Sequence, residues 1–268
     1  MKEISDTVKR VVLPFGVTLY QGDCLEILPT LSGINAVVTD PPYGKGYHSG
    51  GVSSISSNKW KEPSCDKWKG VKIIGDEQPE TSCIPLIKSA VVEGGAIYLC
   101  SQWMVESDWI TALLDADLKV RNRLIWVKPV QGCGDLQTTF GPMHESILFA
   151  AKGRHELRGK REGDVWVEKV GVNGCFRKGL VHPCQKPVPL MGWLIEKSTT
   201  AGDTVLDPYM GSGSTIIAAI RTGRKAIGIE KDPEHFEAAL NRIKEELAQG
   251  DLFRQDDREL KETTLFPE

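Results

Sequence analysis

The sequence has no run of about 18 apolar residues, which is what a membrane-spanning helix requires. Its first twelve residues, MKEISDTVKRVV, lack the apolar core of a secretory signal, so we expect a cytoplasmic, nucleoid-associated protein. The seven cysteines stand singly and no two form a C-x-x-C pair, so no metal site is expected. An odd number of cysteines without an export signal predicts reduced thiols.

An overall excess of positive charge is also missing, because the net charge is −3. The basic residues are concentrated instead. Residues 44–72 contain six lysines against two acids, and residues 151–181 contain eight Lys or Arg against four acids. The C-terminal residues 231–268 reverse the sign, with six basic residues against eleven acidic ones. Two basic segments in an acidic protein favour a local surface that contacts phosphates, although basic loops are also commonly just solvated.

The hydrophobic pattern predicts alternating strands and helices in one large α/β domain with an inserted or appended lobe. Strands are expected at 17–20, 36–39, 95–100, 118–127, 146–151, 204–206 and 225–229. Helices are expected at 24–31, 80–92, 103–115, 187–199, 215–222 and 233–247. The alternation predicts a doubly wound, mostly parallel seven-stranded Rossmann-like sheet with helices on both faces. Residues 44–75 are expected to form a long mobile loop, and residues 251–268 a loosely held polar tail.

The segment Asp207-Pro-Tyr-Met-Gly-Ser-Gly-Ser-Thr215 lies between a predicted buried strand and a predicted helix. Gly211 and Gly213 would let the backbone turn tightly and approach a ligand. Glu230 ends the next strand, where an acid in nucleotide-type sites accepts hydrogen bonds from ribose hydroxyls. Helix capping alone could also explain the two glycines. The third glycine of the dinucleotide signature is absent, because position 216 is Ile, which disfavours a nicotinamide cofactor.

The segment Asp40-Pro41-Pro42-Tyr43 follows another predicted buried strand. Consecutive prolines stiffen the backbone and remove two N–H donors. The Asp40 carboxylate and the Pro41 carbonyl therefore remain as acceptors that suit an amino group with two N–H bonds. Tyr43 could offer a face on which a planar base stacks.

These two motifs resemble those of the amino-group DNA methyltransferases, which combine a [D/N/S]-P-P-[Y/F/W] motif with a glycine-rich cofactor loop. The order here, with the catalytic motif first, resembles the circularly permuted beta group. Gly22-Asp23-Cys24-Leu25, His144-Glu145-Ser146-Ile-Leu148 and His182-Pro-Cys-Gln-Lys186-Pro187 are similar to further elements of that family. The resemblance implies a catalytic domain of residues 1–128 and 182–250, with a target-recognition region at 129–181.

The resemblance also implies the cofactor S-adenosyl-L-methionine, double-stranded DNA as substrate, and a target base flipped out of the helix. Catalytic roles are expected for Asp40, Pro41, Pro42 and Tyr43. Cofactor contacts are expected from Asp23, Cys24, Asp40, Lys186, Asp207, Pro208, Tyr209, Gly211, Ser212, Gly213, Ser214, Thr215, Glu230 and Lys231. Contacts to DNA are expected from Lys45, Lys59, Trp60, Lys67, Trp68, Arg154, Arg158, Lys160, Arg161, Arg177 and Lys178.

Asp40 favours N6 of adenine, because the N4-cytosine members of the family more often carry Ser or Thr at that position. N4-cytosine methylation is the main alternative. Methylation of RNA or of protein glutamine, a non-catalytic DNA-binding relative and a nicotinamide oxidoreductase are further alternatives. The sequence leaves open the recognition site, a cognate restriction endonuclease, and whether the protein is a monomer or a homodimer.

Overall fold

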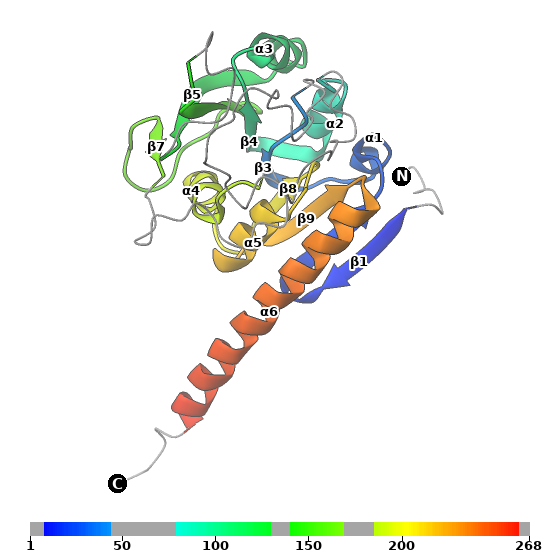
Figure 1. Ribbon diagram of the computed structural model, residues 1–268, viewed down its shortest axis with the longest axis vertical. Helices are drawn as coiled ribbons and strands as arrows, with labels where there is room; N and C mark the ends of the chain where they lie inside the picture. The colour runs from blue at the N-terminus through cyan, green and yellow to red at the C-terminus, as the bar shows by residue number, and fades with distance from the viewer. Residues whose placement is uncertain (1–7, 44–78, 130–139, 169–184, 263–268) are drawn as a thin grey trace, which may run out of the picture.

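The computed structural model describes residues 8–43, 79–129, 140–168 and 185–262, with side chains up to residue 249. The described chain forms one nine-stranded sheet with helices on both faces (Figure 1). The strand order is β1-β2-β9-β8-β3-β4-β6-β5-β7. Its strands are β1 (Lys9–Leu13), β2 (Val17–Gln21), β3 (Ile34–Thr39), β4 (Val91–Ser101), β5 (Lys119–Val127), β6 (His144–Ala151), β7 (Val165–Val167), β8 (Thr204–Asp207) and β9 (Lys225–Glu230).

The seven predicted strands occupy the middle of this sheet, and one further strand lies at each edge. β1 pairs antiparallel with β2, and β7 pairs parallel with β5. Neither edge strand was predicted, because each carries an apolar run of only three residues and none of its residues is fully buried. Strands β2, β9, β8, β3 and β4 are parallel to one another, whereas β6 runs antiparallel to both β4 and β5. The prediction of a mostly parallel, doubly wound sheet is therefore confirmed.

Two apolar clusters cover the two faces of the sheet. One face packs against α4 (Val188–Ser198), α5 (Ser214–Arg221) and α6 (Pro233–Glu262). The other packs against α1 (Cys24–Ile27), α2 (Cys83–Ala90) and α3 (Glu106–Asp115). Short 3-10 turns, η1 (Pro14–Gly16) and η2 (Leu28–Thr30), complete the elements. The central strand β3 is buried at nearly every position because helices cover both of its faces.

Helix α6 begins as expected and ends later than expected. The Asp232 carboxylate accepts hydrogen bonds from the backbone N–H groups of Glu234 and His235, and Pro233 occupies the first position. The helix continues to Glu262, so the predicted helix end at residue 247 is wrong. Leu247 is the last buried apolar residue of α6 among those whose side chains are described, and Figure 1 shows the C-terminal part of α6 projecting away from the sheet. No helix in the described ranges is both long and apolar enough to span a bilayer.

Candidate active site

The acidic residues singled out in the sequence gather at one edge of the sheet. Asp23, Asp40, Asp207 and Glu230 all stand at the carboxyl ends of parallel strands, on β2, β3, β8 and β9. In open α/β sheets this edge is where ligands bind. The two motifs are 167 residues apart from Asp40 to Asp207, but β3 and β8 are neighbours in the sheet. The fold therefore joins the two predicted motifs into one site.

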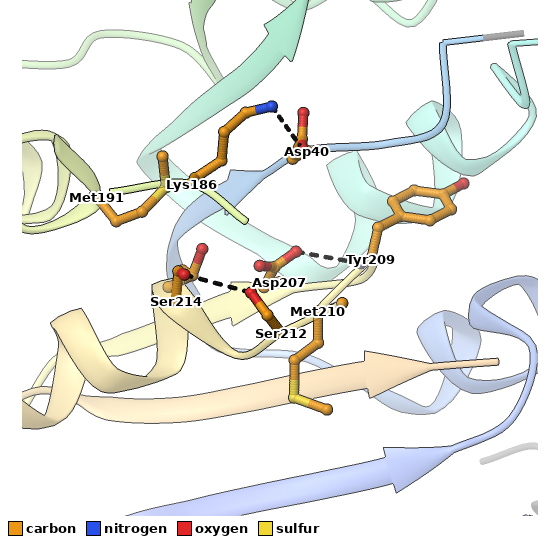
Figure 2. Close-up of a pocket in the computed structure, with 10 residues that line it drawn as sticks. Asp40, Lys186, Met191, Asp207, Tyr209, Met210, Ser212 and Ser214 are labelled. Carbon is orange, nitrogen blue, oxygen red and sulfur yellow. Dashed lines mark hydrogen bonds and ion pairs between the residues drawn. The ribbon is translucent and has the colours of Figure 1, made fainter. Parts of the chain in front are cut away.

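A pocket lies between these two motifs, and the residues that line it are drawn as sticks in Figure 2. Asp40 and Lys186 stand on one side of the pocket, and the segment after β8 forms the other. The lining residues are Asp40, Lys186, Met191, Asp207, Tyr209, Met210, Gly211, Ser212, Ser214 and Thr215. Eight of these ten were predicted as catalytic or cofactor-contacting residues. Met191 and Met210 are the two that the sequence analysis did not select.

The floor of the pocket is built around the buried carboxylate of Asp207. Thr39 Oγ1 donates to Asp207 Oδ1 over 2.7 Å, and the backbone N–H of Tyr209 donates to the same oxygen over 3.1 Å. Asp207 is only 3% exposed. Burial raises the pKa of Asp207 to about 7, although hydrogen bonds from Thr39 and Thr215 oppose the shift. This carboxylate can therefore gain or lose a proton near neutral pH.

The loop after Asp207 is held open by its own backbone and by α6. Gly213 has φ of 77°, a left-handed conformation that glycine adopts without steric strain, and it caps the start of α5. One guanidinium nitrogen of Arg242, on α6, donates to the Ser212 carbonyl over 2.7 Å and to Ser214 Oγ over 3.2 Å. These contacts fix the loop at the wall of the pocket.

Glu230 and Asp23 mark the continuation of the site along the sheet edge. Glu230 accepts backbone hydrogen bonds from Gly211 and Asp232, each at 2.8 Å. Asp23 caps α1 through the N–H of Leu25, and its other oxygen pairs with Lys231 Nζ at 2.8 Å. Neither carboxylate lines the pocket: Glu230 lies beside the glycine loop, and Asp23 lies after the neighbouring strand β2. Each carboxylate oxygen has two lone pairs, so these bonds leave acceptor positions for ribose hydroxyls.

Tyr209 lines the pocket, and its contact with the cofactor stays a prediction. Figure 2 shows its ring directed away from Asp207, and it packs with the cluster that covers the α1 and α2 face. Its hydroxyl is buried without a hydrogen bond of standard geometry, next to the thiols of Cys24 and Cys83. Burial raises the pKa of Cys24 to about 11 and that of Cys83 to about 12, so both thiols stay protonated near neutral pH.

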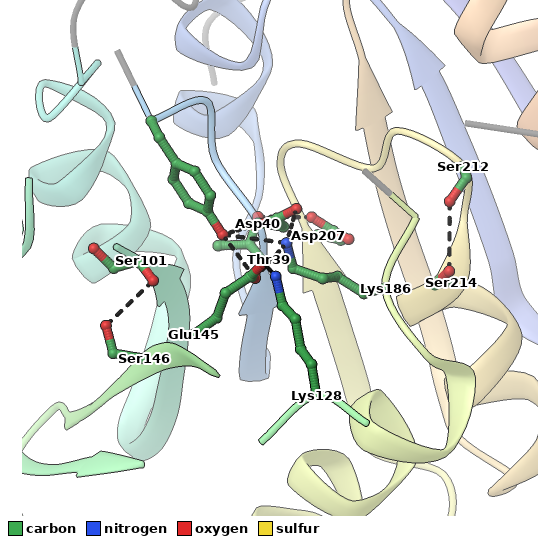
Figure 3. A network of polar contacts seen from close by, with 11 residues as sticks. Thr39, Asp40, Ser101, Lys128, Glu145, Ser146, Lys186, Asp207, Ser212 and Ser214 are labelled. Atoms are coloured by element: carbon green, nitrogen blue, oxygen red, sulfur yellow. Dashed lines mark hydrogen bonds and ion pairs between the residues drawn. The ribbon is translucent and has the colours of Figure 1, made fainter. Parts of the chain in front are cut away.

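Asp40 lies in a tight cluster of charged side chains (Figure 3). Lys186 Nζ is 2.7 Å from Asp40 Oδ2 and 3.0 Å from Glu145 Oε2, and it donates to the Tyr43 hydroxyl over 3.1 Å. Tyr43 in turn donates to Asp40 Oδ1 over 2.6 Å. Lys128 forms an ion pair with Glu145 Oε1. The cluster therefore contains two carboxylates and two ammonium groups, with the Tyr43 hydroxyl between them.

Burial acts on the two carboxylates of this cluster with different results. Burial raises the pKa of Asp40, while the Lys186 ammonium opposes that rise. Burial also works against ionisation of Glu145, but the ammonium groups of Lys186 and Lys128 outweigh it and bring the pKa of Glu145 to about 2. Glu145 is therefore the permanently charged member, and Asp40 is the one whose ionisation depends on its neighbours.

The four predicted DNA-contacting residues within the described ranges are not among the residues that line this site. Arg154, Arg158, Lys160 and Arg161 follow β6, at the opposite edge of the sheet. The backbone shows this placement, because Arg158 N donates to the carbonyl of Lys197 at the end of α4 over 2.8 Å. Arg154 pairs with Glu156 on the surface. The other seven candidates lie outside the described residues: Lys45, Lys59, Trp60, Lys67, Trp68, Arg177 and Lys178.

Four polar residues of the site were not selected from the sequence: Thr39, Lys128, Glu145 and Arg242. Thr39 is the last residue of β3 and directly precedes the D-P-P-Y motif, which was a usable signal. Glu145 lies in the predicted strand segment H-E-S-I-L, where a charged residue beside a buried apolar run indicates a pairing requirement. Lys128 and Arg242 had no local signal, since a lysine after a strand and an arginine on an amphipathic helix are ordinary surface residues.

The sheet order and the pocket define an α/β methyltransferase architecture with an acceptor motif facing a glycine loop. The DNA methylase family model (N6_N4_Mtase) matches residues 34–241, and the chain belongs to this family of DNA methyltransferases. YubD of Escherichia coli K12, which is named as a methylase, is 30% identical over 228 residues, covering 83% of this chain and 88% of that protein. The type II methyltransferase M2.DpnII of Streptococcus pneumoniae is 28% identical, covering 80% and 83%.

A solved structure with the same fold supports the architecture. The M1.HpyAVI–SAM complex superposes with a TM-score of 0.60 and 24% identity, and the match covers 84% of this chain and 98% of that one. The family spans methylation of N6 of adenine and N4 of cytosine, and both reactions place a methyl group on an exocyclic amino nitrogen. The chain is therefore a DNA methyltransferase of the amino-group class.

Proposed function

We propose that this protein transfers a methyl group from S-adenosyl-L-methionine to N6 of adenine at a specific DNA sequence. The observation that carries the proposal is the partly exposed Asp40 carboxylate at the pocket that the Asp207–Thr215 loop completes. Its side chain is 22% exposed, whereas those of Lys186 and Glu145 are 8% and 11% exposed. Asp40 is thus the carboxylate of the cluster that an incoming amino group can reach.

The residues of the pocket fit the cofactor that the family uses. Ser212, Ser214 and the glycine backbone offer hydrogen-bonding groups to the amino-acid portion, and Asp207 offers a negative charge. Glu230 and Asp23 continue the edge toward the positions expected for ribose and adenine. When bound, S-adenosylmethionine supplies an electrophilic methyl group on a positively charged sulfur. Its binding to a solved neighbour with this fold supports the assignment.

The chain's own residues orient the target amino group. Asp40 and the Pro41 carbonyl would accept its two N–H bonds, which keeps the nitrogen lone pair directed toward the methyl donor. The rate gain would come from alignment and from electrostatic stabilisation of the charge that develops on the nitrogen. Such an approach requires the base to leave the double helix, so we infer base flipping. The aspartate at position 40 supports adenine over cytosine.

The first experiment is transfer of labelled methyl from S-adenosylmethionine to unmethylated genomic DNA, followed by nucleoside analysis. Wild type and Asp40→Ala are compared, and equal binding of S-adenosylmethionine by both shows that the cofactor pocket is intact. The expected result is N6-methylated adenine from wild type and none from Asp40→Ala. N4-methylcytosine would overturn the assignment of the base. Product formation by Asp40→Ala at the wild-type rate would overturn the role of Asp40.

A further inference from the structure

We propose that Glu145 is a positioning residue for methyl transfer. It holds the Lys186 ammonium beside Asp40, and it keeps that ammonium in place while Asp40 accepts the target amino group. This inference rests on the proposed role of Asp40 as the acceptor. It adds a second carboxylate whose function is to act on Lys186 and not on the substrate.

The first argument is that the Lys186 ammonium is fully engaged. An ammonium has three donors, and Lys186 has three acceptors, on Asp40, Glu145 and Tyr43, at 2.7, 3.0 and 3.1 Å. Both oxygens of Asp40 are also engaged, one by Lys186 and the other by the Tyr43 hydroxyl. Each Asp40 oxygen therefore already holds one donor of the protein and keeps one further lone pair. An incoming amino group can bind that lone pair or displace one of these two donors.

The second argument is the charge balance around Lys186. If Asp40 were the only anion near Lys186, their ion pair would be strong because this place is poorly solvated. Pairing of Asp40 with the target amino group would then leave the buried ammonium without a counter-charge. Glu145 removes this penalty because it offers a second anion at 3.0 Å. Lys128 forms an ion pair with the other oxygen of Glu145, Oε1, and so balances part of the charge of that carboxylate. Asp40 can therefore exchange one donor for another without leaving a charge unpaired.

The test is Glu145→Gln in the full-length protein, with kcat, KM for DNA and the S-adenosylmethionine Kd measured separately. We expect kcat to fall by about 10- to 100-fold, because a misplaced group near the reacting atoms can reduce the rate by roughly that factor. KM and Kd should change by less than about threefold, since the lost interaction acts in the transition state. Glu145→Asp retains the charge and should recover part of the rate.

The pH profile provides a readout that a purely structural role would not move. The groups around Asp40 are Lys186, Tyr43, Glu145, Asp207 and Cys100. The negative charge of Glu145 raises the pKa of Asp40, and the positive charge of Lys186 lowers it. The acid limb of kcat should therefore move to lower pH in Glu145→Gln and to higher pH in Lys186→Met. Glu145→Asp should leave it near the wild-type position.

Glu106→Gln is the matched control. The Glu106 side chain is 13% exposed, close to the 11% of Glu145, and it accepts a hydrogen bond from Ser146, the next residue on β6. Within the part of the chain that the structure describes, Glu106 contacts Arg123 and Ser146 and no member of the Asp40 cluster, so kcat and the acid limb should stay at wild-type values. Equal losses in Glu106→Gln and Glu145→Gln would overturn the positioning role.

The outcomes separate this inference from the proposed function. If wild type methylates no adenine or cytosine amino group, the proposed function fails, and the role of Glu145 fails with it. If wild type is active and Glu145→Gln has an unchanged kcat, only the role of Glu145 fails. If Glu145→Gln does not fold, Glu145→Asp and Lys186→Met decide the matter. Acid limbs that do not differ between these two variants would then count against the inference.

Discussion

Replacement of Asp207 by Asn should stabilise the folded protein while weakening its cofactor site. Burial raises the pKa of Asp207 from 3.8 to about 7. A raised pKa in the folded state means that the stability present below the unfolded pKa is lost as the pH rises through about 7. At 1.36 kcal/mol per pKa unit, this shift costs about 4 kcal/mol at pH 8, where the folded carboxyl is ionised, and about 2 kcal/mol at pH 5, where folding requires the carboxyl to take up a proton. Asn does not ionise and avoids this cost.

The geometry allows Asn to keep the native hydrogen bonds. Its amide oxygen can accept from Thr39 and from the Tyr209 N–H, as Asp207 Oδ1 does now. Its amide nitrogen can donate to the hydroxyl of Thr215, which can act as an acceptor as well as a donor. No large change in packing is expected, because the two side chains have nearly the same shape.

The assay is urea unfolding of wild type and Asp207→Asn between pH 5 and pH 8. All other titrating groups are common to both proteins, so the difference in unfolding free energy isolates Asp207. The stability advantage of the variant should grow by about 2 kcal/mol across this range. In parallel, S-adenosylmethionine affinity should rise with pH in wild type, as the anion forms, more than in the variant. An advantage that is absent at pH 8, or equal at both pH values, would falsify the reasoning.

Two further predictions concern glycines around the cofactor loop. A Cβ on Gly228 would lie 2.4 Å from Met210 Sδ and 3.1 Å from Ile216 Cδ1. Gly228→Ala should therefore destabilise the fold by about 1–3 kcal/mol through overpacking, and it should lower cofactor affinity. Thermal melts and titration calorimetry test this, and an unchanged melting temperature would contradict it. Gly213→Ala places a side chain at φ of 77° and 3.0 Å from Ile243 Cδ1, whereas Gly202→Ala, at φ of 87°, meets no atom within 4 Å. Both variants should lose about 1–2 kcal/mol of stability from the strained backbone. Only Gly213→Ala should also weaken cofactor binding. Equal cofactor affinities in the two variants would argue against a role for the Asp207–Thr215 loop in binding.

The sequence was sufficient to predict the central sheet, because seven of its strands combine apolar runs with clear turn residues on either side. The family resemblance placed Asp40 and Asp207 in one cofactor site, and the fold explains this, since both motifs follow buried strands whose carboxyl ends face the same edge. The edge strands β1 and β7 were missed because half-exposed strands depend on pairing partners that local sequence does not reveal. The extension of α6 was missed because its last turns lack an apolar face.

The polar partners of the site were harder to predict than its motifs. Glu145 and Lys128 become important only because β6 lies beside β4 and β5 lies beside β6, which brings both residues to the Asp40 cluster. No spacing in the sequence records that proximity. The position of the basic residues that follow β6 was not predicted from the sequence either. Charge content suggested a surface for phosphates, and the fold places Arg158 at the end of α4, away from the sheet edge that holds Asp40. Their contact with DNA stays a prediction.

The adjacency of β3 and β8 also has a consequence for how the enzyme is made. Thr39 and Asp207 share a hydrogen bond but are 168 residues apart, so the acceptor half of the site leaves the ribosome long before its partner. At about 5–20 residues per second, β3 would wait roughly ten to thirty seconds for the strand that covers its edge. During synthesis the nascent chain therefore exposes an apolar central strand, and catalytic competence appears only when the last third of the polypeptide has emerged.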